Sequence, residues 1–139
     1  MNMNILVTLN SNYIKPLKVM LKSLFLNNPG EQFTVYLMHS SLKEPELDDL
    51  TGYIEAHGNR LAIVDIDGSY FTDAPILLHY TKEMYYRLLA YKFLPPVPDR
   101  ILYLDPDILV INPVKELYNM DICMPPPSMT LFLLRKSTG

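Results

Sequence analysis

Glycine and cysteine are scarce in this sequence, and tryptophan is absent. The five glycines, at positions 30, 52, 58, 68 and 139, cannot be fitted to G-x-G-x-x-G or to the P-loop pattern. Ordinary Rossmann dinucleotide binding and P-loop chemistry are therefore excluded. Because Cys123 is the single cysteine, no internal disulfide can form, which excludes a small disulfide-bonded secreted fold. We expect reducing, cytoplasmic surroundings.

Long apolar runs and a strong charge bias are also missing. No stretch approaches the roughly 20 apolar residues that span a bilayer, and residues 1–4 lack the positive charge of a signal peptide. The formal net charge of -3 gives no electrostatic footprint for nucleic acid. With 139 residues, 49% of them hydrophobic, the chain fits one globular domain. An anionic ligand must then be held by a local arrangement of residues or by a metal ion.

Apolar periodicity predicts that strands and helices alternate along the chain. The predicted strands are Asn4–Leu9, Gln32–Met38 and Leu61–Ile66, and the predicted helices run from Tyr13 to about Asn28, from the capping box Ser41–Glu44 to Gly58, and from Thr81 toward Phe93. Such alternation is typical of an α/β fold with a mainly parallel sheet flanked by helices. Residues 1–121 form this predicted unit. Residues 122–139 contain no acid and include three consecutive prolines, which predicts an irregular tail apart from the brief run Leu131–Leu134.

Two aspartates separated by a proline, Asp105 and Asp107, lie between the apolar runs 101–104 and 108–111. Pro106 favours extended geometry at the residue before it, and in an extended segment residues i and i+2 point the same way. Carboxylate oxygens suit Mg²⁺ or Mn²⁺, and carboxylates buried between apolar runs are costly unless a cation pairs with them. Ligands of parallel α/β sheets bind at the carboxyl ends of strands, so we expect the loop Thr8–Tyr13 at the same edge.

The aspartate spacing alone leaves other interpretations open. An Asp-Pro pair often starts a turn, and a second D-x-D, Asp65 to Asp67, is typical of a strand end with a solvated turn. A haloacid-dehalogenase-like phosphohydrolase would use Asp105 as nucleophile and Asp107 as general acid, although Leu109 stands where that signature has Thr or Val. In a non-catalytic α/β module both aspartates would be structural.

Three segments together resemble the family 8 glycosyltransferases, in the correct order and spacing over residues 4–121. They are ILVTLNSNY at 5–13, MYYRL at 84–88 and RILYLDPDILVINP at 100–113. The resemblance implies a GT-A fold, which is Rossmann-like, and a retaining, metal-dependent transferase that moves a hexose from a UDP-sugar to a saccharide or similar acceptor. Glycogenin and bacterial lipopolysaccharide galactosyl- and glucosyltransferases belong to this family.

The resemblance also assigns roles to particular residues. It implies that Asp105 and Asp107 bind Mn²⁺ or Mg²⁺, which bridges the diphosphate of the donor. The implied UDP-sugar contacts are Thr8, Asn10, Asn12, Tyr13, Arg87 and Asp105. Among these, Asn10 and Asn12 would hydrogen-bond the base or ribose, Tyr13 would stack on uracil, and Arg87 would contact the donor phosphate or sugar. The family often has Asp at the position of Asn10, and a surface salt bridge on a helix is the alternative role of Arg87.

The family pattern continues for about as long again after the two aspartates. That second half contributes a third metal ligand, usually His, and the acceptor site, whereas His39, His57 and His79 all precede the aspartates and are interpreted as strand-end or loop residues. We therefore expect this chain to carry the donor-binding part without transferase activity of its own. No residue is assigned as a catalytic nucleophile. Bacterial relatives often dock on membranes through a basic C-terminal tail, so peripheral membrane association stays open for a longer enzyme.

Overall fold

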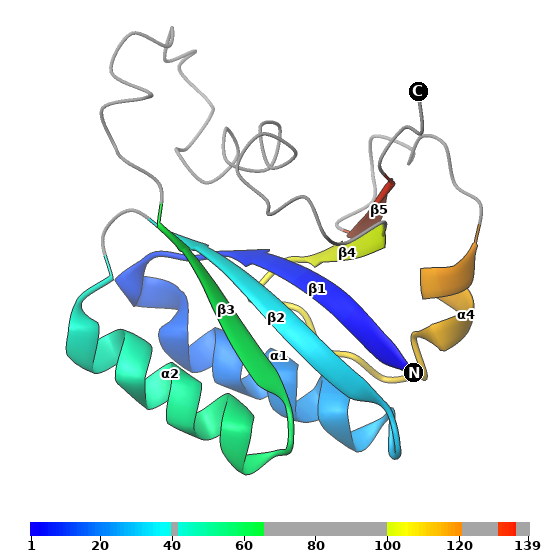
Figure 1. Cartoon of the computed structure of the whole chain (residues 1–139), viewed down its shortest axis with the longest axis horizontal. Helices are drawn as coiled ribbons and strands as arrows, with labels where there is room; N and C mark the ends of the chain where they lie inside the picture. Colours follow the sequence, from blue (N-terminus) through cyan, green and yellow to red (C-terminus); the bar gives the residue numbers. More distant parts are fainter. Residues whose placement is uncertain (40–41, 66–99, 121–130, 136–139) are drawn as a thin grey trace, which may run out of the picture.

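The computed structural model describes residues 1–39, 42–65, 100–120 and 131–135, and in these residues five strands form one sheet (Figure 1). The strands are β1 (Asn2–Thr8), β2 (Gln32–His39), β3 (Arg60–Asp65), β4 (Arg100–Leu104) and β5 (Leu131–Arg135). The helices are the 3₁₀ turn η1 (Ser11–Tyr13), α1 (Ile14–Leu26), α2 (Glu44–Ala56) and α4 (Lys115–Asn119). The first three predicted strands and the first two predicted helices are confirmed, with ends that differ by a few residues.

The strand order in the sheet is β3-β2-β1-β4-β5. The first four strands run parallel, and β5 pairs antiparallel with β4. The predicted α/β fold with a mainly parallel sheet is therefore confirmed. Strand β5 lies in the stretch 122–139 and begins with the one run, Leu131–Leu134, that stood out in it. The rest of that stretch lies outside the described residues, and so does the predicted helix from Thr81 toward Phe93.

Helices α1 and α2 cover one face of the sheet, as Figure 1 shows. Tyr53 of α2 donates its hydroxyl to the Lys18 carbonyl of α1 at 3.0 Å, which joins the two helices. Alternate residues of the strands and every third or fourth residue of the helices meet in the core. This core includes Met3, Ile5, Val7, Leu17, Leu21, Leu24, Phe33, Val35, Leu37, Leu50, Ile54, Leu102 and Leu104.

The opposite face of the central strands is buried as well. Its buried residues are Leu6, Thr8, Tyr36, Met38, Ile101 and Tyr103. Burial on both faces explains why β1 and β2 are nearly continuous apolar runs rather than alternating ones, since parallel strands are usually covered on both sides. Two of these residues, Thr8 and Tyr103, are joined by a hydrogen bond between their hydroxyl groups and lie toward the carboxyl ends of the strands.

Helix α2 begins two residues later than the capping box Ser41–Glu44 predicts. Lys43 is the N-cap residue, and its backbone N–H donates to the Glu46 carboxylate at 2.9 Å. Pro45 then occupies the first turn, where a missing N–H costs nothing because the first N–H groups of a helix have no partner within it. The helix is followed by Gly58, whose φ of 77° is a left-handed conformation that glycine adopts readily.

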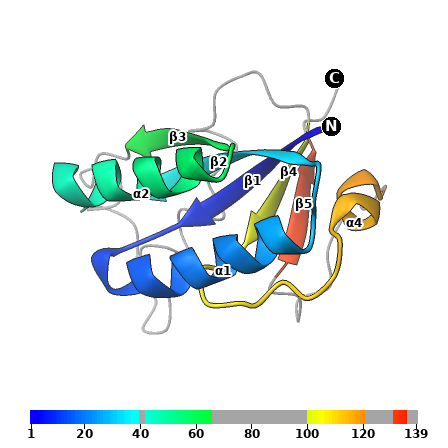
Figure 2. The ribbon, with the colours of Figure 1, turned by 90° about the horizontal axis from the view of Figure 1, so that it is seen from below.

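The second apolar run, Ile108–Ile111, forms no strand. It passes along α1 on its way from β4 to α4, as Figure 2 shows. Polar side chains of the last turns of α1 satisfy its backbone. Ser23 Oγ accepts from the Val110 N–H and Asn27 Nδ2 donates to the Val110 carbonyl, each at 2.9 Å. This segment therefore leaves β4 and turns under the helical layer immediately after the two aspartates.

Candidate functional site

The two polar loops that the sequence singled out leave neighbouring strands at one edge of the sheet. Strands β1 and β4 are parallel neighbours, with Leu6 opposite Tyr103. Thr8 and Asp105 each follow this last pair by two residues. The loops 8–13 and 105–107 therefore lie at the same carboxyl edge, as expected from the sequence.

This edge is also the place where the chain changes its direction of travel across the sheet. From β1 the order runs outward through β2 to β3, and β4 then lies on the other side of β1. Ligands of open α/β sheets bind outside the carboxyl ends of the strands at such a switch point. The candidate site is thus the space between the ends of β1 and β4.

The first loop is shaped by Asn10. Its side-chain oxygen accepts from the Asn12 N–H at 2.9 Å, and its carbonyl accepts from the Tyr13 N–H at 3.1 Å, which caps η1. Asparagine before a polar tripeptide is a usual helix cap, so this role agrees with the sequence. Asn12 is exposed, and the side chain of Tyr13 is 42% exposed. The loop therefore presents an aromatic ring and an amide at the surface, while Asn10 organises the turn.

Thr8 differs from the rest of the loop because it is buried. Only 3% of it is exposed, and its Oγ1 lies 3.1 Å from the hydroxyl of Tyr103, which is 2% exposed. Tyr103 did not appear among the predicted site residues. The signal for it is a tyrosine within the otherwise aliphatic run 101–104, since a buried phenol hydroxyl usually has a hydrogen-bond partner.

The second loop is a turn rather than an extended segment. Asp105 follows β4 and is half-buried, whereas Pro106 and Asp107 form the turn and Asp107 is exposed. The expectation of an extended segment with both carboxylates buried between apolar runs is therefore wrong. Proline favours the second position of a turn, and this local preference prevails because the chain must bend from β4 toward α1. The cost of burial thus gives no argument for a cation at Asp107.

The chemistry of the donor set still fits a divalent cation. Asp105 and Asp107 supply carboxylate oxygens from one short loop, and Mg²⁺ is commonly held by one or two carboxylates together with substrate phosphates and water. In the residues that the structure describes, no group of three or more His, Cys, Asp and Glu side chains could hold a metal by itself. The pair therefore suits a cation that arrives with a phosphorylated ligand.

The histidines in the described ranges occupy ends of secondary structure, as interpreted from the sequence. His39 ends β2, is 4% exposed, and accepts the Leu42 N–H at its Nδ1 at 3.3 Å. His57 is the C-cap residue of α2. His79 lies outside the described residues, as do Arg87 and Asp67, so the predicted phosphate contact of Arg87 stays a prediction.

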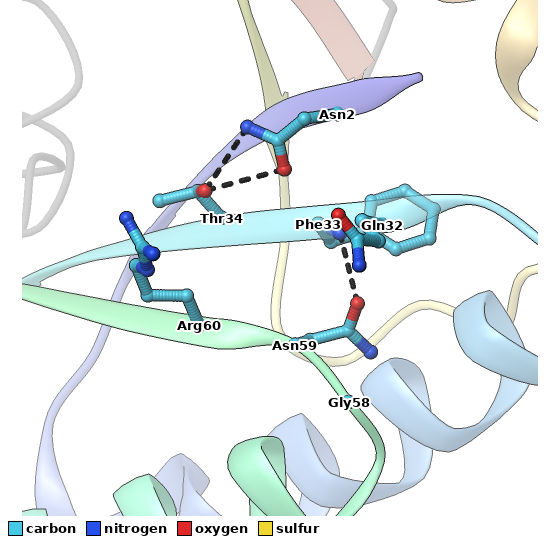
Figure 3. Close-up of a pocket in the computed structure, with 7 residues that line it drawn as sticks. All are labelled: Asn2, Gln32, Phe33, Thr34, Gly58, Asn59 and Arg60. Carbon is cyan, nitrogen blue, oxygen red and sulfur yellow. Dashed lines mark hydrogen bonds between the residues drawn. The ribbon is translucent and has the colours of Figure 1, made fainter.

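A pocket of about 260 Å³ lies at the other end of the strands. Figure 3 shows the residues that line it: Asn2, Gln32, Phe33, Thr34, Gly58, Asn59 and Arg60. Asn2 Nδ2 donates to the Thr34 hydroxyl at 3.2 Å, and Asn59 Oδ1 accepts from the Phe33 N–H at 2.8 Å. None of the predicted site residues lines this pocket, and its polar groups join the amino-terminal ends of the strands.

Comparison with known proteins identifies the family to which this chain belongs. The family model described as "Glycosyl transferase family 8" matches residues 4–125, which is most of the chain. The chain belongs to glycosyl transferase family 8. This membership agrees with the resemblance seen in the sequence, and it favours the glycosyltransferase family over the phosphohydrolase class.

Individual family members match this chain over part of their own length. A lipopolysaccharide 1,2-glucosyltransferase of Escherichia coli (strain K12) is 22% identical over 120 residues, covering 86% of this chain and 36% of the relative. Glycosyltransferase GlyF of Streptococcus pneumoniae serotype 4 is 28% identical over 123 residues, covering 88% of this chain and 30% of the relative. The chain thus spans about a third of the length of these curated relatives.

Solved structures of the family share the fold. The galactosyltransferase LgtC, crystallised with donor and acceptor sugar analogues, superimposes with a TM-score of 0.74 at 23% identity. The match covers 86% of this chain and 43% of LgtC. The α/β architecture is therefore that of the family 8 enzymes. Across the described parts of the chain, no helix is long and apolar enough to cross a membrane.

Proposed function

We propose that this chain is the donor-binding part of a metal-dependent, retaining glycosyltransferase that moves a hexose from a UDP-sugar to a saccharide or similar acceptor. Family membership supports the transferase class. The observation that carries the donor assignment is the position of loops 8–13 and 105–107 at the switch point between β1 and β4. The cytoplasm is the proposed location, on the basis of the single cysteine.

The uridine end of the donor is assigned to the first loop. The exposed ring of Tyr13 offers a flat surface on which uracil can stack, and the exposed Asn12 amide offers donors and an acceptor for base or ribose. The side-chain oxygen of Asn10 already accepts the Asn12 N–H, so Asn10 acts by fixing the turn that presents these two side chains.

The diphosphate end is assigned to the second loop. Asp105 and Asp107 would hold Mn²⁺ or Mg²⁺, and such a cation supplies Lewis-acid stabilisation of the negative charge that grows on the departing diphosphate. A cation between the two groups is needed because phosphates and carboxylates are both negatively charged and repel each other. Asp105 lies at the end of β4 and Asp107 in the turn that follows. These two residues and the loop 8–13 can hold one donor only if the ends of β1 and β4 keep their relative positions. The predicted contact of Arg87 would add a bidentate hold on the same charge.

A thermal-shift panel tests the assignment. The chain is heated with UDP-glucose, UDP-galactose or UDP-N-acetylglucosamine, each with and without Mn²⁺, and we expect at least one donor to raise the melting temperature only when the metal is present. Asp105→Asn should abolish this shift, while Asp48→Asn, a change of an exposed aspartate on α2, should retain it. Equal shifts with and without metal, or no shift from any donor, would contradict the proposal.

Binding and turnover are expected to separate in this chain. The relatives extend well beyond the part that it matches, and the resemblance assigns their acceptor site to that further part. We therefore expect metal-dependent donor binding without transfer to an added saccharide. Release of UDP in the presence of donor and acceptor, above the rate without protein, would contradict this half of the proposal.

A further inference from the structure

Backbone pairing between β1 and β4 stops before the two loops begin. The paired residues are Ile5 with Leu102 and Leu6 with Tyr103. On its other side, β1 stays joined to β2 up to Thr8, and the Leu9 N–H still donates to the Met38 carbonyl at 3.1 Å. The first loop is therefore anchored to β2 by the backbone, but the ladder does not anchor it to β4.

The hydroxyl pair Thr8–Tyr103 continues the connection where the ladder ends. Thr8 lies on the same face as Leu6, so it is the diagonal neighbour of Tyr103, within reach of an aromatic side chain. The two oxygens are 3.1 Å apart, and both residues are almost fully buried. Burial protects this bond from competition by water, which makes its geometry more strongly determined than that of a surface bond.

We propose that the Thr8–Tyr103 pair is a positioning contact that fixes the uridine loop of β1 relative to the two aspartates after β4. Asn10 follows Thr8 by two residues, and Asp105 follows Tyr103 by two. A shift of either strand end would therefore move one half of the donor site away from the other. Neither hydroxyl touches the donor in this proposal, which rests on the proposed function because UDP is the ligand whose two ends the loops would hold.

Calorimetric titration with UDP and Mn²⁺ gives the first test. Tyr103→Phe removes the hydroxyl and keeps the ring, and Thr8→Val removes the other hydroxyl at nearly constant volume. We expect each change to weaken UDP binding by about three- to tenfold, the range that one hydrogen bond of ordinary strength supports. Thr8→Ser, which keeps a hydroxyl, should restore most of the affinity. The double variant should lose no more than either single variant, because both changes break the same bond.

Tyr118→Phe is a matched control at the amino-terminal ends of the same two strands, β1 and β4. The Tyr118 hydroxyl is also buried, donating to the Arg100 carbonyl at 2.9 Å and accepting from the Asn4 N–H at 3.2 Å. Its loss should lower the melting temperature without changing the affinity for UDP. Unchanged affinity in Tyr103→Phe, the same loss in Tyr118→Phe, or multiplied losses in the double variant would overturn the proposal.

Hydrogen exchange separates this proposal from the proposed function. In Tyr103→Phe without ligand, we expect faster amide exchange in residues 9–13 and 105–108 together, with exchange in α2 unchanged. If the unaltered chain does not bind UDP with Mn²⁺ but both loops loosen together, the donor assignment fails and the positioning contact stands. If exchange quickens in neither loop or in one alone, the positioning contact fails whatever the chain binds.

Discussion

At the scale of single residues, exposure separates the side chains that can meet a ligand from those that organise the site. Tyr13 and Asn12 face the surface, whereas Thr8 is buried and Asn10 is bonded within its own turn. The four residues lie within six consecutive positions, yet two of them are exposed to a ligand and two of them organise the loop. The sequence predicted the place of this loop at the carboxyl edge of the sheet, but residue type alone did not distinguish the two roles, because threonine and asparagine can serve either.

Tyr13 provides a direct prediction for donor binding. Tyr13→Ala should weaken UDP binding by about 1–3 kcal/mol, the usual contribution of a base stacked on an aromatic ring. Tyr13→Phe should bind nearly as well as the unaltered chain, since the ring is retained. Calorimetry measures both, and a melting curve checks that stability is little changed, as expected for a ring that is 42% exposed. Equal losses in the two variants would point to the hydroxyl instead of the ring.

Glu31 gives the chain a pH dependence away from the candidate site. The hydrogen bond from Lys115 is the main cause that lowers the pKa of Glu31 from its ordinary value of 4.5, and the N-terminal amine of Met1 lowers it further. Both cations lie 3.3 Å from the carboxylate. Because the pKa is lower in the folded state, the ionised carboxylate stabilises the fold above 4.5, and this stabilisation disappears as pH falls through the folded-state pKa.

Glu31→Gln should therefore destabilise the chain at neutral pH, and the difference from the unaltered chain should shrink as the solution is acidified below 4.5. Urea unfolding at several pH values measures this, with Glu55→Gln, a change of an exposed residue on α2, as the control. Added salt should also reduce the difference, because the ion pairs are partly in contact with solvent. A difference that persists unchanged in acid would show that Glu31 acts through packing.

At the scale of elements, the ends of the helices follow from local sequence signals, whereas the contacts between elements do not. Gly30 and Gly58, with φ values of 81° and 77°, follow the ends of α1 and α2 as the sequence predicts. The path of residues 108–114 along α1 was not predictable, since their apolar pattern is equally typical of a strand. It is decided by Ser23, Asn27 and Asn28, whose side chains bind the backbone of this segment.

Ser23 is the residue through which this element contact can be tested. Ser23 is buried, and its Oγ accepts the Val110 N–H while donating to the Met20 carbonyl at 2.7 Å. Ser23→Ala leaves a buried N–H without its partner, so we expect a loss of about 1–3 kcal/mol in unfolding free energy. Urea denaturation measures it, and Thr51→Ala, whose hydroxyl bonds only within α2, should cost less. A smaller loss for Ser23 than for Thr51 would contradict this account.

At the scale of the whole molecule, strand order makes the site. The alternation of strands and helices predicted a parallel sheet, and a parallel sheet places all carboxyl ends at one edge. The alternation of strands and helices does not predict which strand lies beside β1. The order β3-β2-β1-β4 puts the two polar loops on adjacent strands, where a single ligand can contact both.

The sequence by itself determined the family, the α/β class and the two loops, because these depend on residue type and short-range periodicity. Tertiary structure decided two further features: the neighbour of β1 and the bond between Thr8 and Tyr103. Both depend on which segments far apart in the chain pack together. Residues 8 and 103 are 95 positions apart, and no local sequence pattern indicates that their hydroxyl groups are hydrogen-bonded to each other.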